Sequence, residues 1–452
     1  MIDIEDRVKA TLCSFLAQSR AEELVLLFSG GRDSTVLLEL LVVIRDELSF
    51  RLRAAHIDHG LNSDSNAQAK ECARLAREKD VDLKVYEVDM KPPKGQSVEE
   101  WARNERYKII RRDINSKSLV LTAHHFNDHV ETVIQRVIQG AGPYGLRGIV
   151  PLRKLDPGHI GRPLLKVSRD EITSYARERE LVWYEDPMNY ELRYERTRIR
   201  NFVIPSLKSL SEKVESRLEK LSKIQTELCD ILDHTADFYL AEEHFLPKKL
   251  SVKSLSSNKG LLRPYILRKA LTDSGFPVPR EKKLEAIINQ MLEAKVDANP
   301  IIRIGAHELR RYDGYIYMIG SPQENLVRDE TFEWDPMESF RLPWGSLSIG
   351  ETAAFGINEQ FFEDRKFTIK FRQGGERFWP SNRDKSNELK KLFQEWKVPP
   401  WERALIPLIY YDDELVAVAG QGIARKFVRK FGLGKPCLGF LWNNSIYNSR
   451  AL

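Results

Sequence analysis

Short apolar runs alternate with longer segments of helical periodicity through the N-terminal part of the chain. Runs with the length and composition of buried strands fall at 24–28, 52–57, 83–88 and 119–123. Apolar residues recur every three or four positions at 1–20, 35–48, 64–79, 97–112 and 128–139. Strands that alternate with helices predict an α/β fold with a doubly wound parallel sheet, which binds ligands beyond the carboxyl ends of its strands.

The pattern changes in the second half of the chain. Positions 207–239 predict one long helix, 261–318 predict helices followed by strands, and 340–440 predict a small β-rich domain. An acidic, turn-rich stretch at 321–336 marks a boundary. We therefore expect an α/β domain at 1–205, a helical linker at 206–240, a mixed α+β domain at 241–330 and a β-rich domain at 337–452.

The composition, 42% hydrophobic and 30% charged, is that of a soluble globular protein. No apolar run approaches the ~18 residues of a membrane span, and the acidic N-terminus lacks the apolar core of a signal peptide, so we expect a cytoplasmic protein with no membrane partner. The 4 cysteines are far apart, which argues against disulfide scaffolds, zinc ribbons and cysteine-ligated iron–sulfur clusters. The net charge of +5 permits a nucleic-acid partner without requiring one.

One stretch, S-G-G-R-D-S, joins the first predicted strand to the helix after it. Its glycines let the backbone bend and approach a ligand, and a helix N-terminus presents unpaired N–H groups to anions. We therefore predict a phosphate cradle formed by Ser29, Gly30, Gly31, Arg32, Asp33 and Ser34. The stretch lacks the lysine of a Walker loop and the third glycine of a dinucleotide fingerprint. An ordinary strand–helix turn is the structural alternative.

Two further polar turns follow strands of the same predicted sheet. Asp58 and His59 follow the second strand, and His124 and His125 follow the fourth. Parallel strands end at one edge of a sheet, so these side chains are expected near the cradle. The alternatives are that Asp58 and His59 are turn residues and that the two histidines are surface or packing residues.

Carboxylates and arginines near these turns suggest more specific roles. Asp33 could coordinate Mg²⁺, which prefers oxygen ligands, or could only cap its helix. Asp128 and Glu131 lie three positions apart on a helix, share one face, and could bind a second metal or a substrate ammonium group. Several arginines could contact phosphate or nucleotide, or could lie on a solvated helix face: Arg103, Arg106, Arg196, Arg198 and Arg200.

The stretch at 29–34 resembles the pyrophosphatase loop of the N-type ATP pyrophosphatases, and later motifs narrow the resemblance. In order they are D-H-G-L, E-x-x-A-R-x-x-R-Y, H-H-x-x-D-x-x-E-T, G-x-G-x-x-G-L-x-G, R-P-L-L, E-D-P and R-T-R-I-R, at 58–61, 99–107, 124–132, 140–148, 162–165, 185–187 and 196–200. Together they resemble the bacterial tRNA(Ile)-lysidine synthetase family over most of 22–205. Positions 261–318 and 371–403 resemble the middle and carboxyl-terminal tRNA-binding domains of that family.

The resemblance implies an ATP- and Mg²⁺-dependent ligase. It would adenylate C2 of the wobble cytidine of the isoleucine tRNA with a CAU anticodon, and free L-lysine would then displace AMP to give lysidine. The loop with Asp58 and His59 would serve ATP, and Asp33 with Asp128 would hold the metal. Asp33, Asp128 and Glu131 would be catalytic, whereas the substrate would meet Arg103, Arg106, His124, His125, Arg196, Arg198 and Arg200.

The chain departs from the family pattern at a few positions, chiefly Asn127, which stands where an aspartate is usual. This departure gives weak support to a tRNA-binding protein without activity. Another tRNA-modifying enzyme with the same loop is the second alternative, although a cluster-dependent thiolase would need closely spaced cysteines. An amidotransferase would need its own glutaminase domain, for which Cys13 is too isolated. The oligomeric state, a homodimer included, does not follow from the sequence.

Overall fold

The computed structural model describes residues 3–60, 65–88, 98–185, 192, 195–242, 248–257, 260–295, 298–320, 330–352, 356–357, 361, 367–428 and 437–444. The chain divides into two compact units, Met1–Asp230 and Ile231–Leu452, and each is described by itself. Leu61 and the pair Asp186–Pro187, which belong to the sequence motifs, lie outside the described residues. No helix among the described residues is both long enough and apolar enough to cross a membrane.

The first unit is built on a six-stranded sheet in the order β3-β2-β1-β4-β6-β5. Its strands are β1 (Glu23–Leu27), β2 (Arg51–Asp58), β3 (Asp82–Glu87), β4 (Ser118–Leu121), β5 (Leu152–Leu155) and β6 (Gly158–Gly161). Every neighbouring pair is parallel except β5 and β6, which form an antiparallel hairpin at one edge. The predicted α/β fold with a doubly wound parallel sheet is confirmed, and the edge hairpin is an addition that the sequence pattern did not predict.

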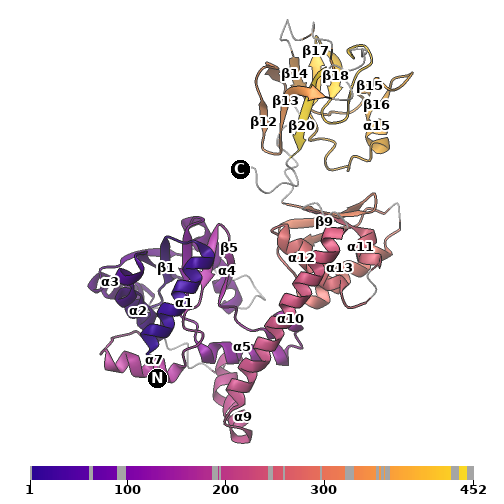
Figure 1. Ribbon diagram of the computed structural model, residues 1–452. Coiled ribbons are helices and arrows are strands. Elements are labelled where there is room, and N and C mark those ends of the chain that lie inside the picture. The colour runs from indigo at the N-terminus through magenta and orange to yellow at the C-terminus, as the bar shows by residue number, and fades with distance from the viewer. Residues whose placement is uncertain are drawn as a thin grey trace. The chain divides into compact units, whose positions relative to one another are not determined.

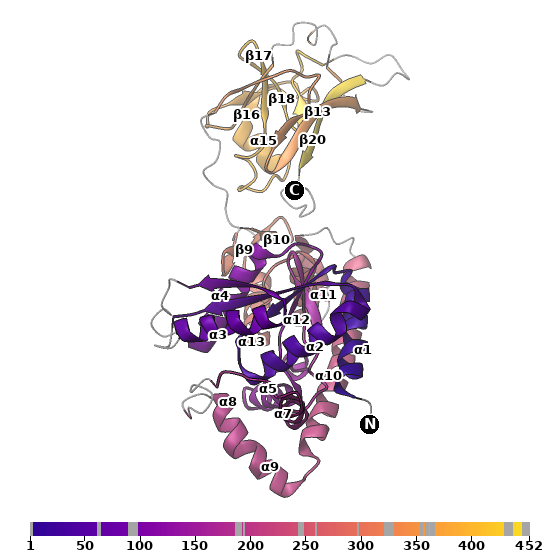
Figure 2. The same ribbon diagram turned by 90° about the vertical axis from the view of Figure 1, so that its left-hand side faces the viewer.

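Helices cover both faces of this sheet (Figures 1 and 2). Leu24 and Leu26 of β1 point into one core with α1 (Ile4–Ser19), α2 (Arg32–Leu48), α3 (Ser65–Glu78) and α7 (Arg169–Glu178). Val25, between them, points into a second core with α4 (Val98–Asp113). Successive strand side chains alternate in direction, so one apolar run supplies both cores. This arrangement leaves the carboxyl edge of the strands open for the site.

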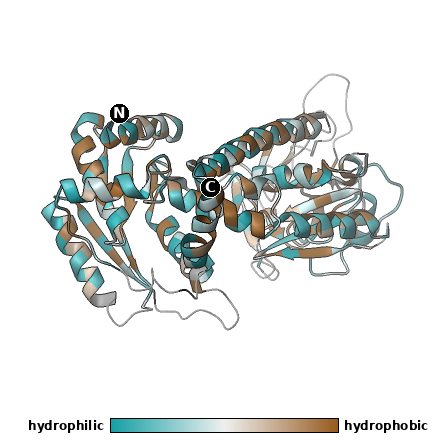
Figure 3. Cartoon of the chain, turned by 90° about the horizontal axis from the view of Figure 1, so that it is seen from below, coloured by the Kyte–Doolittle hydropathy of each residue, from teal (hydrophilic) through white to brown (hydrophobic). Residues whose placement is uncertain are grey.

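The remaining helices follow the sheet and end in a long helix that begins in the first unit and continues into the second. They are α5 (Phe126–Ile138), α6 (Pro143–Leu146), α8 (Glu195–Arg198), the π-helix η2 (Ile199–Val203), α9 (Ile204–Leu210) and α10 (Val214–Glu242). The single helix predicted at 207–239 is wrong, because Ser211 takes an extended conformation (φ −161°, ψ 115°) and separates α9 from α10. Apolar and polar residues alternate along the helices, as Figure 3 shows, which is typical of helices that pack on one side.

The second unit begins with a layer of helices on a small sheet. The helices are α11 (Val252–Ser257), α12 (Arg263–Asp273) and α13 (Glu281–Glu293), and the strands are β7 (Lys249–Ser251), β8 (Ile301–Ile304), β9 (His307–Tyr312) and β10 (Tyr315–Ile319). The sheet order is β7-β10-β9-β8, and all neighbouring strands are antiparallel. A single apolar core joins both layers. The predicted mixed α+β character of this part is confirmed.

The C-terminal part is β-rich, as predicted. A five-stranded sheet contains β11 (Phe332–Trp334), β14 (Phe367–Lys370), β17 (Leu408–Tyr411), β18 (Glu414–Val418) and β19 (Gly422–Ile423). A three-stranded sheet contains β12 (Phe340–Leu342), β13 (Gly345–Thr352) and β20 (Cys437–Asn444), and the short pair β15 (Arg377–Phe378) and β16 (Asn387–Glu388) precedes α15 (Leu389–Glu395). An aromatic-rich core holds these elements together. The domain limits proposed from the sequence stay a prediction.

Candidate active site

The glycine-containing loop lies where β1 ends and α2 begins. Helix α2 starts at Arg32, and Gly31 is its N-cap without any side-chain cap. The first intrahelical bond is donated by Thr35 N to Gly31 O (2.9 Å). The N–H groups of the first turn therefore have no partner within the helix, which makes this end of α2 suited to an anion. The alternative in which Asp33 only caps this helix is not what the structure has, because Gly31 is the N-cap.

Residues that are distant in sequence hold the loop in its conformation. Gly30 has φ +75°, in the left-handed region, and a Cβ at this position would lie 2.7 Å from Cys72 Sγ on α3. Gln68 Nε2, also on α3, donates to Ser29 O (2.8 Å), and Tyr184 N donates to Gly30 O (2.8 Å). The conformation of the cradle thus depends on α3 and on the segment around Tyr184.

We expect Gly30→Ala to weaken binding of ATP, the ligand that the resemblance of this loop implies, and to destabilise the first unit. A left-handed backbone costs an L-residue about 1–2 kcal/mol, and the contact with Cys72 adds to that cost. The double variant Gly30→Ala/Cys72→Ala removes the contact but keeps the strain, so it should recover only part of the loss. Urea unfolding and ATP titration of both variants check this. Full recovery in the double variant would show that backbone strain has no part in the effect.

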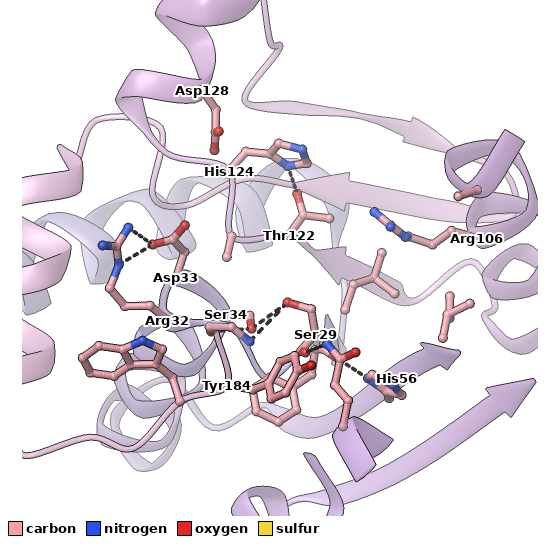
Figure 4. Close-up of a pocket in the computed structure, with 18 of the residues that line it drawn as sticks. Ser29, Arg32, Asp33, Ser34, His56, Arg106, Thr122, His124, Asp128 and Tyr184 are labelled. Atoms are coloured by element: carbon pink, nitrogen blue, oxygen red, sulfur yellow. Dashed lines mark hydrogen bonds and ion pairs between the residues drawn. The ribbon is translucent and has the colours of Figure 1, made fainter. Parts of the chain in front are cut away.

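A cavity of about 800 Å³ opens at the carboxyl edge of the sheet, a size suited to a nucleotide. The ends of β1, β2 and β4, the helices α4 and α5, and the region 196–201 all contribute to its walls. In Figure 4, Arg32 and Asp33 lie on one side of this space, and Arg106 lies on the opposite side. Five arginines line the cavity, namely Arg32, Arg106, Arg169, Arg196 and Arg200. They give the cavity the cationic character that a polyphosphate ligand requires.

Two carboxylates converge on one buried imidazole at the centre of the site. His125 Nε2 lies 3.6 Å from Asp33 Oδ2 and 3.6 Å from Asp128 Oδ2. His125 Nδ1 accepts a hydrogen bond from Asn127 N (3.2 Å), and Asp128 Oδ2 accepts one from His125 N (3.0 Å), which closes a capping box on α5. Because Nδ1 is an acceptor, Nε2 carries the hydrogen and faces both carboxylates. His125 therefore fixes the positions of the Asp33 and Asp128 carboxylates.

The surroundings keep these carboxylates ionised. Burial raises the pKa of Asp33, but the neighbouring N–H of His125 and the adjacent Arg32 outweigh it and lower the pKa to about 2. Burial also opposes ionisation of Asp128, but the neighbouring His125, whose backbone N–H donates to the carboxylate, nevertheless lowers its pKa. For His124 the largest effect is burial, which lowers its pKa well below the usual range. Charged carboxylates beside uncharged His124 are suited to a cation rather than to proton transfer.

Most of the predicted site residues line this cavity. They are Ser29, Gly31, Arg32, Asp33, Ser34, Asp58, His59, Arg106, His124, Asp128, Arg196 and Arg200. Asp58 also makes the contact expected of a turn residue, because its Oδ1 accepts a hydrogen bond from Gly60 N (2.8 Å). Burial and the nearby Arg106 lower the pKa of His59 to about 4, and neither ring nitrogen of His59 has a hydrogen-bond partner among the described residues. The side chains of Asp58 and His59 are therefore both placed to meet a ligand.

The other predicted residues lie beside or behind the cavity walls. Gly30 is turned toward α3, and His125 is 1% exposed at the start of α5. The Arg103 guanidinium lies over the ring of Tyr107, 5.4 Å from its centroid, and Arg198 is exposed at the end of α8. Glu131 is 0% exposed. A role for these residues in direct contact with substrate stays a prediction.

Glu131 is enclosed by two arginines. Arg200 Nε and Nη2 donate to its two carboxylate oxygens at 2.7 and 3.1 Å, and Arg169 Nη2 lies 3.4 Å from Oε1. Both arginines line the cavity, whereas Glu131 does not. Glu131 is therefore placed to orient the guanidinium groups of Arg169 and Arg200 toward a ligand in the cavity.

Asn127, the departure from the pattern of the motifs, is not among the residues that line the cavity. Its Oδ1 accepts from Arg169 N (2.9 Å), which fixes the orientation of the amide, and its Nδ2 donates to Glu215 Oε1 of α10 (3.1 Å). An aspartate here would set a second negative charge against Glu215. The Asn127 amide is therefore suited to its partner Glu215 on α10. Its presence is no evidence that the protein lacks activity.

We expect Asn127→Asp to lower the free energy of unfolding by about 1–3 kcal/mol, because it replaces a hydrogen bond by repulsion between partly buried carboxylates. The partner change Glu215→Gln in the same chain should restore most of the loss. Urea titration of the wild type, both single variants and the double variant measures the coupling. Equal losses in the single and double variants would contradict the pairing.

Several residues of the cavity were missed by the sequence analysis. They are Gln68, Thr122, Arg169, Trp183, Tyr184 and Glu185, together with apolar residues of β2 and α4. Glu185 opens the E-D-P motif, which could have drawn attention to its neighbours Trp183 and Tyr184. No sequence signal marks Gln68 or Arg169, because each reaches the site only through the packing of its helix.

The fold and this site define a class. A strand, an S-G-G-x-D-S loop and a helix N-terminus at the carboxyl edge of a parallel sheet are the ATP-binding part of a PP-loop protein, and the PP-loop domain family matches residues 4–207. Two further families match the rest of the chain. The TilS substrate binding domain matches 250–317, and the TilS substrate C-terminal domain matches 367–434.

Relatives with curated names extend along nearly the whole chain, and each is named tRNA(Ile)-lysidine synthase. The protein of Coxiella burnetii is 34% identical over 407 residues, which cover 89% of this chain and 90% of the relative. One from Vibrio vulnificus is 31% identical, covering 90% and 93%, and one from Methylococcus capsulatus is 30% identical, covering 88% and 92%. The chain belongs to the tRNA(Ile)-lysidine synthase family, as its motifs predicted.

Proposed function

We propose that the protein is an ATP-dependent ligase that joins lysine to C2 of the wobble cytidine in the CAU anticodon of an isoleucine tRNA. Family membership over about nine-tenths of the chain carries this proposal, and the cavity supports it with an intact loop and two ionised carboxylates. Since tRNA and ATP are its substrates, we place the enzyme in the cytoplasm. The alternatives, another PP-loop enzyme or an inactive tRNA-binding protein, have no observation in their favour.

The first step would form an adenylate. The N–H groups at the start of α2 would bind the pyrophosphate part of ATP, and Arg32 and Arg200 line the cavity nearby. The O2 atom of the cytidine would attack the α-phosphorus, and pyrophosphate would leave. These residues bind and orient the reacting groups, which is the main contribution that proteins make to phosphoryl and nucleotidyl transfer.

The second step would form the new C–N bond. The ammonium group of lysine would first give a proton to solvent, the resulting ε-amine would attack C2, and AMP would leave with the former O2 while the second N–H proton passes to solvent. We propose that Asp128 faces the incoming amine, because its pKa is lowered and it lines the cavity beside Asp33. A carboxylate that stays charged can attract an ammonium group and orient it.

Mg²⁺ fits the same acidic pair. Within the described part of the chain no group of three or more His, Cys, Asp or Glu is arranged to hold a metal alone. Asp33 and Asp128 offer two carboxylates that converge within 3.6 Å of one imidazole. Mg²⁺ commonly takes one or two protein carboxylates and completes its shell with phosphate oxygens and water. The bound ion would neutralise phosphate charge in the first step.

The proposal is tested with one assay. The protein is incubated with ATP, Mg²⁺, radiolabelled lysine and an isoleucine tRNA carrying CAU, and a methionine tRNA with the same anticodon serves as control. Label in the isoleucine tRNA alone is the expected result. Release of AMP and pyrophosphate only with another RNA or amine would point to a different acceptor. Binding of tRNA without ATP turnover would leave a binding protein.

A further inference from the structure

A tryptophan stands out on the surface of the C-terminal β-rich part. Trp379 directly follows β15 and is 43% exposed, whereas the preceding Phe378 is 2% exposed in the core. The Trp379 indole Nε1 donates to Arg383 O (2.8 Å) across the turn that begins there. This bond fixes the plane of the ring while much of the ring remains accessible to solvent.

A guanidinium group stacks near the same ring. Arg425 lies with its guanidinium carbon 5.6 Å from the centroid of Trp379, within the range of a cation–π contact. Arg425 N donates to Trp379 O (2.9 Å), and Arg425 Nη1 donates to Arg383 O (2.8 Å) and lies 3.1 Å from Asp384 Oδ1. One backbone hydrogen bond and one shared carbonyl therefore hold the indole and the guanidinium together.

Charged residues lie in the turns on both sides of the ring. The turn after Trp379 carries Arg383, Asp384 and the exposed Lys385, and Arg425 faces it from the turn after β19. A protein partner would favour a contiguous apolar patch, which is not what this turn offers. A rigid indole beside cations suits a nucleobase, whose face stacks on the ring while its phosphate meets the positive charge.

We propose that Trp379 is a stacking platform for an unpaired nucleotide of the bound tRNA, with Arg425 holding the ring in place. The proposal rests on the proposed function, because it takes tRNA as the partner. It commits to an unpaired base, since the bases within a duplex are already stacked on one another and cannot offer a free face. The site is distinct from the ATP cavity, whose described lining residues all belong to the first unit.

The test compares variants of the full chain for affinity to the isoleucine tRNA at several salt concentrations. Trp379→Ala should weaken binding about tenfold or more, the range found when a stacked base loses its aromatic partner. The slope of the logarithm of affinity against the logarithm of salt should not change, because no phosphate contact is lost. Trp379→Phe should retain most of the affinity, and Met337→Ala, which removes another exposed apolar side chain, should have no effect.

Other outcomes would overturn the proposal. Unchanged affinity in Trp379→Ala, or equal losses in the Ala and Phe variants, would exclude stacking, and a flatter salt slope would indicate a phosphate site. Urea unfolding of each variant tells a loss of fold from a loss of contact, and the Phe variant keeps the test valid if the Ala variant unfolds. In the lysine-transfer assay, KM for tRNA should rise in Trp379→Ala with kcat unchanged. Failure of the wild type to bind tRNA would refute the proposed function instead.

Discussion

Replacing Asp33 by asparagine is expected to reduce lysine transfer by more than about a hundredfold while tRNA affinity stays unchanged. Removal of an outer partner of a metal site already costs about 10- to 100-fold, and in the proposed function Asp33 would hold Mg²⁺ itself. The amide keeps the volume and one oxygen but loses the charge that His125 and Arg32 stabilise, with a pKa near 2. The main defect should therefore fall on the chemical steps, with some loss of stability as well, because a lowered pKa means that the folded protein favours the charged carboxylate.

Two measurements separate these effects. Radiolabelled lysine incorporation gives the rate, and filter binding gives the tRNA affinity of the same preparation. Asp46→Asn is the matched control, because Asp46 lies on the same helix with its side chain 91% exposed, and we expect this variant to behave as wild type. A variant Asp33→Asn that turns over at the wild-type rate would remove Asp33 from the active site.

Replacing Arg200 by methionine is expected to lower both stability and activity. Glu131 would remain fully buried with only Arg169 at 3.4 Å, and the loss of one partner of a buried ion pair costs about 3 kcal/mol or more. Urea unfolding measures this loss directly. Because Arg200 also lines the cavity, lysine transfer should fall in the same variant.

The double variant Arg200→Met/Glu131→Leu tells the two roles apart. Apolar side chains of similar volume can replace a buried ion pair at little cost, so the urea midpoint should return most of the way to the wild-type value. Activity should stay low, because the guanidinium is still absent from the cavity. Recovery of activity together with stability would mean that the pair only supports the fold. Persistent instability would mean that Leu does not fit the site of Glu131.

The sequence predicted the sheet well because its signal is local. The apolar run at 24–28 lies between a helix and a glycine turn, and the observed β1 and α2 fall within a few positions of the predicted limits. The hairpin of β5 and β6 was missed, because two four-residue strands leave too short a pattern to stand out. The break at Ser211 was missed for a similar reason, since apolar residues at 207 and 210 continue the helical spacing into the break.

The sequence predicted where the candidate site lies, but it did not predict the direction in which each side chain points. The rule that parallel strands end at one edge brought Asp33, Asp58 and His124 to one cavity. Helical spacing put Asp128 and Glu131 on one face of α5, yet only Asp128 lines the cavity, because Glu131 lies a turn further in among arginines from α7 and η2. Contacts between residues about 40 to 150 positions apart, such as Tyr184 with Gly30, cannot be read from spacing at all.

The amide that joins α5 to α10 has a consequence for the exchange of parts between relatives. Asn127 donates to Glu215, so a change at one of these positions alone is expected to carry a cost. With Glu215 present, aspartate at 127 is expected to give a less stable protein unless residue 215 also loses its charge. The two positions therefore act as one unit in any substitution. Chimaeras that combine this α5 with the α10 of a relative should be compatible only when both positions are exchanged together.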